Sequence, residues 1–157
     1  MKYGLDPAFR FDVSRAVYKG ILRFLSRRYN TPYVVQPLPV GHFSIKAQGG
    51  GRYNLSWRQT TDPLEKTAYP KYYVVEERID NGAFRAVATV AEPRYEVTVT
   101  DSRIHSYRIV AGNDGGTSFP SEVLALYNDG SGVPKANIVN GFTRISAPDT
   151  FFAGEFS

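Results

Sequence analysis

Apolar residues between positions 6 and 29 recur at intervals of three and four. They are Val13, Ala16, Val17, Ile21, Phe24 and Leu25, and this spacing places them on one face of a helix. Asp6 can cap the helix start, and Pro7 suits its first turn. Arg27 and Arg28 suit the C-terminal end of the helix dipole. We therefore expect an amphipathic helix over residues 6–29 that packs its stripe on protein; the rival interpretation is a helix lying on a membrane surface.

After Tyr29 the helical spacing gives way to short strand-like runs. Thr31-Pro32 and Pro37-Leu38-Pro39 stop the helix and favour extended backbone. The expected strands cover residues 42–48, 52–58, 72–79, 83–90, 94–100, 105–112 and 121–127. Glycine, proline, asparagine and aspartate separate these runs. Seven strands without an intervening helix predict a mainly β protein, a sandwich with Greek-key connections behind one N-terminal helix.

Alternation of apolar side chains predicts which face of two strands is buried. One set is Tyr53, Leu55 and Trp57, and the other is His105, Tyr107, Ile109 and Ala111; each set points to one side of its strand. In residues 72–75 both parities are apolar, and no face can be assigned. Asn81-Gly82 predicts a tight hairpin, because a primed turn needs positive φ at its central residues. Gly49-Gly50-Gly51 predicts another hairpin loop, since no helix start or Lys-Ser pair follows to complete a phosphate-binding loop.

Composition and charge exclude several classes of site. The chain has 157 residues, no cysteine, and two histidines, His42 and His105, which excludes disulfides, a thiolate nucleophile and cysteine zinc sites. The net charge of +4 divides into +5 over residues 1–30, 0 over 31–128 and −1 over 129–157. This local excess of cations favours a solvated helix face over a nucleic-acid surface. No stretch reaches the roughly 20 apolar residues of a membrane span, and no signal peptide begins the chain.

Residues 35–127 resemble a fibronectin type III domain, an immunoglobulin-like sandwich. Tyr53-Asn54-Leu55-Ser56-Trp57 looks like its second strand with the core tryptophan, and Tyr73-Val74-Val75 looks like the third. The run from Tyr107 to Ser121, with Asn113 and Gly116, matches its sixth strand, turn and seventh strand. The resemblance implies structural roles for Trp57, Tyr73, His105, Tyr107, Asn113 and Gly116. His105 stands where such domains carry a corner tyrosine, which puts the usual corner hydrogen bond in question.

The flanks resemble parts of large exported bacterial proteins. Residues 16–25 look like the last helix of a zinc-dependent N-acetylmuramoyl-L-alanine amidase domain, and residues 139–148 are similar to a segment of amidase-like and xanthan lyase-type proteins. The zinc ligands and catalytic glutamate of that family precede its last helix, so they have no counterpart here. The domain prediction is a helix remnant at 1–31, a sandwich at 32–128, and a tail or the start of another module at 129–157. The resemblance implies a periplasmic, cell-surface or secreted protein.

No catalytic, metal or cofactor site is expected from the residues. The two histidines are far apart in sequence, and Glu76 and Glu77 point to opposite faces of one strand. No serine has a nucleophile-elbow context. The loop from Gln59 to Pro70 is the best place for recognition, with Tyr69 and Tyr72 as candidate stacking residues for a sugar and packing as the rival interpretation.

The sequence therefore predicts a non-catalytic accessory or spacer module of an exported cell-wall or polysaccharide-processing protein. Its expected partners are the neighbouring domains. The alternative is a carbohydrate- or peptidoglycan-binding module. We expect a monomer, or a weak dimer through the helix, without nucleic-acid binding or membrane insertion.

Overall fold

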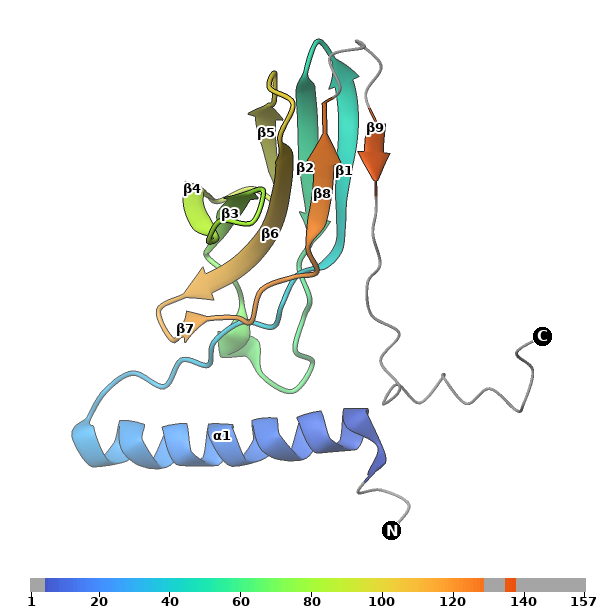
Figure 1. The fold of residues 1–157 in the computed structure, drawn as a ribbon. Helices are drawn as coiled ribbons and strands as arrows, with labels where there is room; N and C mark the ends of the chain where they lie inside the picture. The colour runs from blue at the N-terminus through green and yellow to red at the C-terminus, as the bar shows by residue number, and fades with distance from the viewer. Residues whose placement is uncertain (1–4, 129–134, 138–157) are drawn as a thin grey trace, which may run out of the picture. The chain divides into compact units, whose positions relative to one another are not determined.

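A computed structural model describes residues 5–128 and 135–137 (Figure 1). Helix α1 (Pro7–Tyr29) begins where the sequence predicts: the Asp6 carboxylate accepts a hydrogen bond from Ala8 N at 2.9 Å. Asn30 ends the helix in the left-handed region at φ 52°, and its backbone N–H bonds Ser26 O. No helix in the described part of the chain is long and apolar enough to cross a membrane. Helix and sandwich belong to separate compact units and are described separately.

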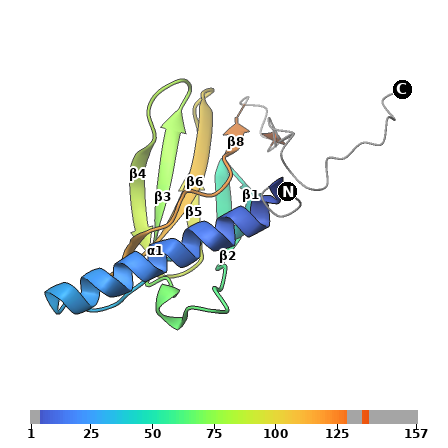
Figure 2. The same ribbon diagram turned by 90° about the horizontal axis from the view of Figure 1, so that it is seen from below.

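The sandwich has two antiparallel sheets, as predicted (Figures 1 and 2). Its strands are β1 (Gly41–Gly49), β2 (Arg52–Arg58), β3 (Tyr72–Ile79), β4 (Arg85–Val90), β5 (Arg94–Thr98), β6 (Ile104–Asn113), β7 (Gly116–Thr117), β8 (Leu124–Tyr127) and β9 (Lys135–Asn137). The smaller sheet has the order β1-β2-β5. The larger has the order β4-β3-β6-β8-β9, with β7 paired to β6. All the expected strands are present, and the short strands β7 and β9 are additions to them.

The core lies between the sheets, and the two alternating sets of side chains point into it. Tyr53, Leu55, Trp57, His105, Tyr107, Ile109 and Ala111 are all buried. On β3 the alternating side chains that face the core are those of Tyr73 and Val75. The indole of Trp57 packs edge-on against Phe43 and Tyr73, with ring centroids 6.4 and 5.4 Å apart. These aromatic contacts join the two sheets, because Trp57 lies on β2 and Tyr73 on β3.

The β3–β4 hairpin forms as predicted, but its turn does not have the predicted geometry. Positive φ occurs at Asp80 (49°), not at Asn81 or Gly82. Asp80 is anchored to the start of β6: its N–H donates to Ile104 O at 2.8 Å, and its carboxylate accepts from Ile104 N at 3.0 Å. These two hydrogen bonds to Ile104 explain why Asp80, rather than Asn81 or Gly82, adopts the left-handed conformation.

In the β1–β2 hairpin the expected glycine loop is present, with positive φ at Gly49, Gly50 and Gly51.

Two strands at the edges of the sheets carry β-bulges. In β1 the register with β2 shifts between Gly41 and Ser44 and again between Ala47 and Gly49, with the extra residue on β1 each time. In β4 the extra residue is Val87, because Val75 pairs with Ala88 whereas the next residue of β3 pairs with Ala86. Bulges bend an edge strand and interrupt its row of free hydrogen-bonding groups.

Candidate functional site

The loop between β2 and β3 borders a surface cavity of about 330 Å³. Its lining residues are Gln59, Thr61, Asp62, Pro63, Glu65, Lys66, Ala68 and Tyr69. Internal hydrogen bonds shape the loop: the Asp62 carboxylate accepts from Leu64 N at 3.0 Å, and Glu65 Oε1 accepts from the Thr67 hydroxyl at 2.8 Å. The cavity therefore combines amide, carboxylate, ammonium and aromatic groups, which is a chemistry suited to small polar ligands.

The structure separates the two candidate stacking residues. Tyr69 lines this cavity and is 64% exposed. Tyr72 lies outside it and packs on the backbone of β6, where a Cβ added at Gly112 would meet the Tyr72 ring at 2.3 Å. Gly112 thus makes room for the ring, and Tyr72 has a packing role. Tyr69 is therefore the one of the two that lines the cavity, whereas Tyr72 is half-buried.

Asn113 fastens three segments together at the C-terminal end of β6. Its side-chain Nδ2 donates to three carbonyl oxygens, those of Val35, Thr67 and Tyr69, at 2.9, 3.0 and 3.2 Å. Its Oδ1 accepts from Gly115 N at 2.8 Å. Asn113 is buried at 5% exposure, so these four bonds satisfy groups that water does not readily reach.

Glycines allow the chain to turn tightly beside Asn113. Gly116 has φ 126°, a value that disfavours side chains. At Gly115 an added Cβ would meet Val34 O at 2.3 Å. The turn therefore lies directly against the segment that leads into the sandwich.

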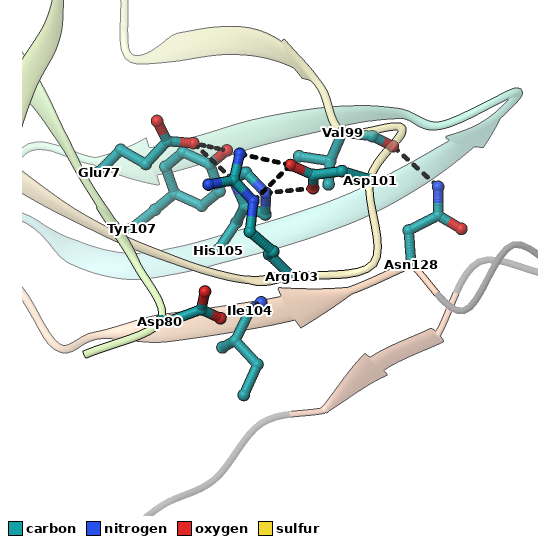
Figure 3. A network of polar contacts seen from close by, with 9 residues as sticks. All are labelled: Glu77, Asp80, Val99, Asp101, Arg103, Ile104, His105, Tyr107 and Asn128. Atoms are coloured by element: carbon teal, nitrogen blue, oxygen red, sulfur yellow. Dashed lines mark hydrogen bonds and ion pairs between the residues drawn. The ribbon is translucent and has the colours of Figure 1, made fainter. Parts of the chain in front are cut away.

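A partly buried polar cluster occupies the opposite end of β6, with His105 and Tyr107 buried and Arg103 exposed (Figure 3). The His105 ring lies between two carboxylates, with Nδ1 2.9 Å from Glu77 Oε1 and Nε2 2.7 Å from Asp101 Oδ1. The Tyr107 hydroxyl donates to the same Glu77 oxygen at 2.6 Å. Arg103 closes the cluster on the solvent side through Asp101 Oδ2, with Nε at 2.7 Å and Nη2 at 2.6 Å. His105 thus forms side-chain hydrogen bonds to two carboxylates.

The cluster shifts the proton affinities of two members. Burial first, and then the hydrogen bond to Glu77, raises the pKa of Tyr107 far above its ordinary value. Hydrogen bonds from His105 and then Arg103 hold the pKa of Asp101 below its ordinary value. Tyr107 therefore stays protonated and Asp101 stays ionised around neutral pH.

On β3 the adjacent glutamates point to opposite faces, as the strand period predicts. Glu77 joins the His105 cluster, whereas Glu76 pairs with Arg108 on the outer face, with Arg108 Nε 2.6 Å from Glu76 Oε2. The guanidinium of the next residue, Arg78, lies over the Phe84 ring, 4.9 Å from the centroid. Each carboxylate therefore has a structural partner.

The sequence pattern singled out His105 and Asn113, but it did not reveal Glu77, Asp101 or Thr67 as their partners. These residues come from segments far apart in the chain, and only the β3–β6 register brings Glu77 opposite Tyr107. An aspartate four residues before a core-facing histidine was the available signal for Asp101. Among residues 5–128 and 135–137, no group of histidines and carboxylates could hold a metal ion.

No protein-family model matches the sequence, and a search of curated proteins finds no match. Solved structures do match. The C. elegans twitchin kinase region has a TM-score of 0.55 and 20% identity over 64% of this chain, but the match spans only 18% of that chain. A chain described as a human fourth FNIII domain has a TM-score of 0.53 and 21% identity, covering 64% of this chain and 85% of its own. The sixth fibronectin type III domain of human fibronectin type III domain containing protein 3 has a TM-score of 0.51 and 18% identity, covering 64% and 93%. The resemblances of the flanks to exported amidase-like proteins remain predictions, whereas the sandwich has the fold of a fibronectin type III domain.

Proposed function

We propose that this chain supplies a non-catalytic module that spaces and orients the neighbouring domains of a larger protein. The observation that carries the proposal is that the chain enters and leaves the sandwich at opposite ends of β6. We call the C-terminal end of β6 the first pole and its N-terminal end the second pole. The segment leading into the sandwich is fastened at Val35 to Asn113, the last residue of β6. The β8 strand ends at Tyr127, which pairs with Ile104, the first residue of β6. The chain thus traverses the sandwich from one pole to the other before β9 pairs along β8.

Hydrogen bonds at both poles favour a stiff spacer. Asn113 holds the leading segment at the first pole, and Asn128 Nδ2 donates to Val99 O at 2.9 Å at the second. The ten residues of β6 set the separation, about 33 Å at about 3.3 Å per strand residue. The rigid body fixes the distance between its two poles; β9 then runs antiparallel to β8 and ends beside Ala125, two residues back from the second pole.

Spin labels test the rigidity directly. The chain has no cysteine, so Thr117→Cys and Ser102→Cys give one exposed label near each pole. Dipolar spectroscopy of the doubly labelled full chain should show a narrow distance distribution centred at about 30–40 Å, the strand length plus label arms. A broad distribution would exclude a rigid spacer.

An activity assay tests the non-catalytic assignment. Incubation with peptidoglycan and with xanthan, with and without Zn²⁺, should release no product; metal-dependent turnover would overturn the assignment.

The second candidate function is glycan binding, and the cavity beside Tyr69 favours it. An exposed aromatic ring next to amide and carboxylate groups suits a sugar, which stacks its apolar face and hydrogen-bonds its hydroxyls. Titration with soluble peptidoglycan fragments and xanthan oligosaccharides separates the two functions. Saturable binding that Tyr69→Ala abolishes would establish a binding module. Phe119→Ala is the matched control, because Phe119 is also an exposed aromatic residue, at 73%, outside this cavity.

The same proposal sets the module in an exported cell-wall or polysaccharide-processing protein, in the periplasm, at the cell surface or secreted. It is supported by the likeness of residues 16–25 to the last amidase helix and of residues 139–148 to amidase-like and xanthan lyase-type proteins. The coding sequence on either side tests this context: an amidase zinc site upstream would support it, and an unrelated domain would contradict it.

A further inference from the structure

The outer face of the smaller sheet, β1-β2-β5 (Figure 1), carries more basic than acidic side chains. Side chains along these strands alternate between the core and the outer face. Glu96 is the one acidic residue of the three strands, and it lies on the outer face. The exposed basic residues on the same face are Lys46, Arg52, Arg58 and Arg94. We call this surface, formed by the outward side chains of the three strands, the cationic face.

The strand register arranges the cationic face. On β2, Ser56 lies between its two pairing partners, Ser44 on β1 and Arg94 on β5. Arg52 and Arg58 begin and end β2, which places them about 20 Å apart at about 3.4 Å per residue. The positive charges are therefore spread along and across the sheet, with hydroxyl groups between them.

These four cations are not neutralised by acids of the chain. Within the described part of the chain, none of their side chains takes part in an ion pair or a hydrogen bond. Residues 31–128 have no net charge, whereas the cationic face has four cations against the single carboxylate of Glu96. An excess of one sign of charge on one face attracts a ligand of the opposite sign.

A hollow of about 830 Å³ lies at the Arg58 end of the cationic face. It is found at the first β-bulge of β1, where two residues of β1 stand opposite Trp57. His42, Ser44, Ser56 and Arg58 supply its polar lining. The hydroxyl oxygens of Ser44 and Ser56 lie 2.9 Å apart. The hollow thus adds imidazole and hydroxyl hydrogen-bonding groups to a guanidinium.

We propose that the cationic face binds an acidic polysaccharide. Carboxylates of the sugar chain contact the four cations, and one sugar residue occupies the hollow, where the serine hydroxyls meet its hydroxyls. The residues involved differ from those that line the cavity beside Tyr69. Binding at the cationic face also does not depend on the proposed spacer function.

The side chains of the cationic face favour a polysaccharide over other anionic partners. No large apolar or aromatic side chain is exposed on β1, β2 or β5, all of which the structure describes. Single-stranded nucleic acids stack their bases on aromatic rings, and membranes and protein partners bury apolar anchors. An acidic sugar chain instead presents carboxylates, which guanidinium groups bind well, and hydroxyls, which pair with serine and asparagine side chains.

Titration of the full-length wild-type chain with oligogalacturonate tests the binding. Each sugar of this probe carries a carboxylate, and its methyl ester is the matched uncharged control. Backbone amide signals of Ser44, Ser56 and Arg94 should shift saturably, and the fluorescence of Trp57, the single tryptophan, should change. The ester should cause neither change, and added NaCl should weaken the binding of the acid because salt screens exposed charges. An absence of saturable binding, or equal binding of acid and ester, would overturn the proposal.

Paired substitutions test whether the ligand lies on the cationic face. Arg58→Gln with Arg94→Gln should raise the dissociation constant for oligogalacturonate at least about fivefold, since two exposed charge contacts are lost. Lys71→Gln with Arg85→Gln is the matched control, because these cations are also exposed and lie outside the cationic face. Urea unfolding verifies that both variants are folded. Equal weakening by the two pairs would reduce the effect to net charge, and unchanged binding in the first pair would place the ligand elsewhere, such as on the basic helix. Either result would overturn the proposal.

Two further comparisons test the ligand class and separate this site from the others. Polyglutamate and double-stranded DNA should bind the wild type more weakly than oligogalacturonate does, and Tyr69→Ala should bind oligogalacturonate as the wild type does. Tighter binding of either other polyanion, or loss of binding in Tyr69→Ala, would overturn the proposal. The spin-label distances report on the spacer function alone, so failure of one proposal is distinguishable from failure of the other.

Discussion

Asn113 forms four hydrogen bonds at the first pole, where the chain enters the sandwich, and we call this set of bonds the Asn113 clamp. Replacing Asn113 removes it. In Asn113→Ala, the carbonyls of Val35, Thr67 and Tyr69 and the N–H of Gly115 all lose their partner. A typical hydrogen bond contributes about 0.5–1.5 kcal/mol net, so four bonds give about 2–6 kcal/mol. That loss is a large share of the stability of an ordinary domain, about 5–15 kcal/mol.

The variant Asn113→Asp separates hydrogen bonding from packing. Aspartate has nearly the same shape and keeps the acceptor for Gly115 N, but its second oxygen would face three carbonyl oxygens. We therefore expect Asn113→Asp to cost at least as much as Asn113→Ala at pH 7, and less at a pH where the new carboxyl is protonated. If only shape mattered, the aspartate would be tolerated.

Urea unfolding of the full chain, followed by tryptophan fluorescence, measures both variants. The single tryptophan, Trp57, lies in the core of the sandwich, so the signal reports on this unit. Asn54→Ala is the matched control: Asn54 is half-buried on β2, and we expect a change within about 0.5 kcal/mol. An Asn113→Asp chain within about 0.5 kcal/mol of the wild type would refute the clamp.

Four further changes test other parts of the structure. Trp57→Ala should cost about 3–5 kcal/mol in urea unfolding because it deletes a large buried aromatic; a loss below about 1 kcal/mol would place Trp57 outside the core. Gly112→Ala should cost about 1–3 kcal/mol because the new methyl meets the Tyr72 ring, and less in a Tyr72→Ala background; equal costs would show that the two do not touch. Tyr107→Phe should cost about 1.5–3 kcal/mol by removing a hydrogen bond to a charged group. Since burial raises the pKa of Tyr107, its share of stability is lost as the pH rises above about 10, and Tyr107→Phe should flatten that alkaline decline. A chain shortened to begin at Tyr33 should melt at a lower temperature or, by light scattering, lose a dimer, because the apolar stripe of the helix needs a surface; unchanged mass and melting temperature would contradict this.

Local patterns predicted the parts of the fold that local physics determines. Successive side chains of a strand alternate between its two faces. The alternation therefore predicted correctly that Tyr53, Leu55 and Trp57 are buried. Helix α1 begins at Pro7 because Asp6 caps it. In residues 72–75 the pattern gave no face, since Tyr72 packs outside the core on Gly112.

Features that depend on register between distant strands could not be predicted in this way. Glu77 meets His105 and Tyr107 only because β3 and β6 pair in one register. Asp80 takes the positive φ expected of Asn81-Gly82 because Ile104 holds it. Strand β9 has three residues, too few for any hydrophobic period, and the rest of the expected tail lies outside the described residues.

The bulges in β1 and β4 bear on how such a sandwich behaves beside other folded domains. When two domains are joined by a short flexible linker, the effective concentration of each around the other is millimolar. At such concentrations a flat edge strand would exchange hydrogen bonds with the edge of a neighbour and misassemble. The extra residues on β1 and Val87 on β4 interrupt that pairing at an edge of each sheet. The bulges therefore limit edge-to-edge pairing between this sandwich and another β domain.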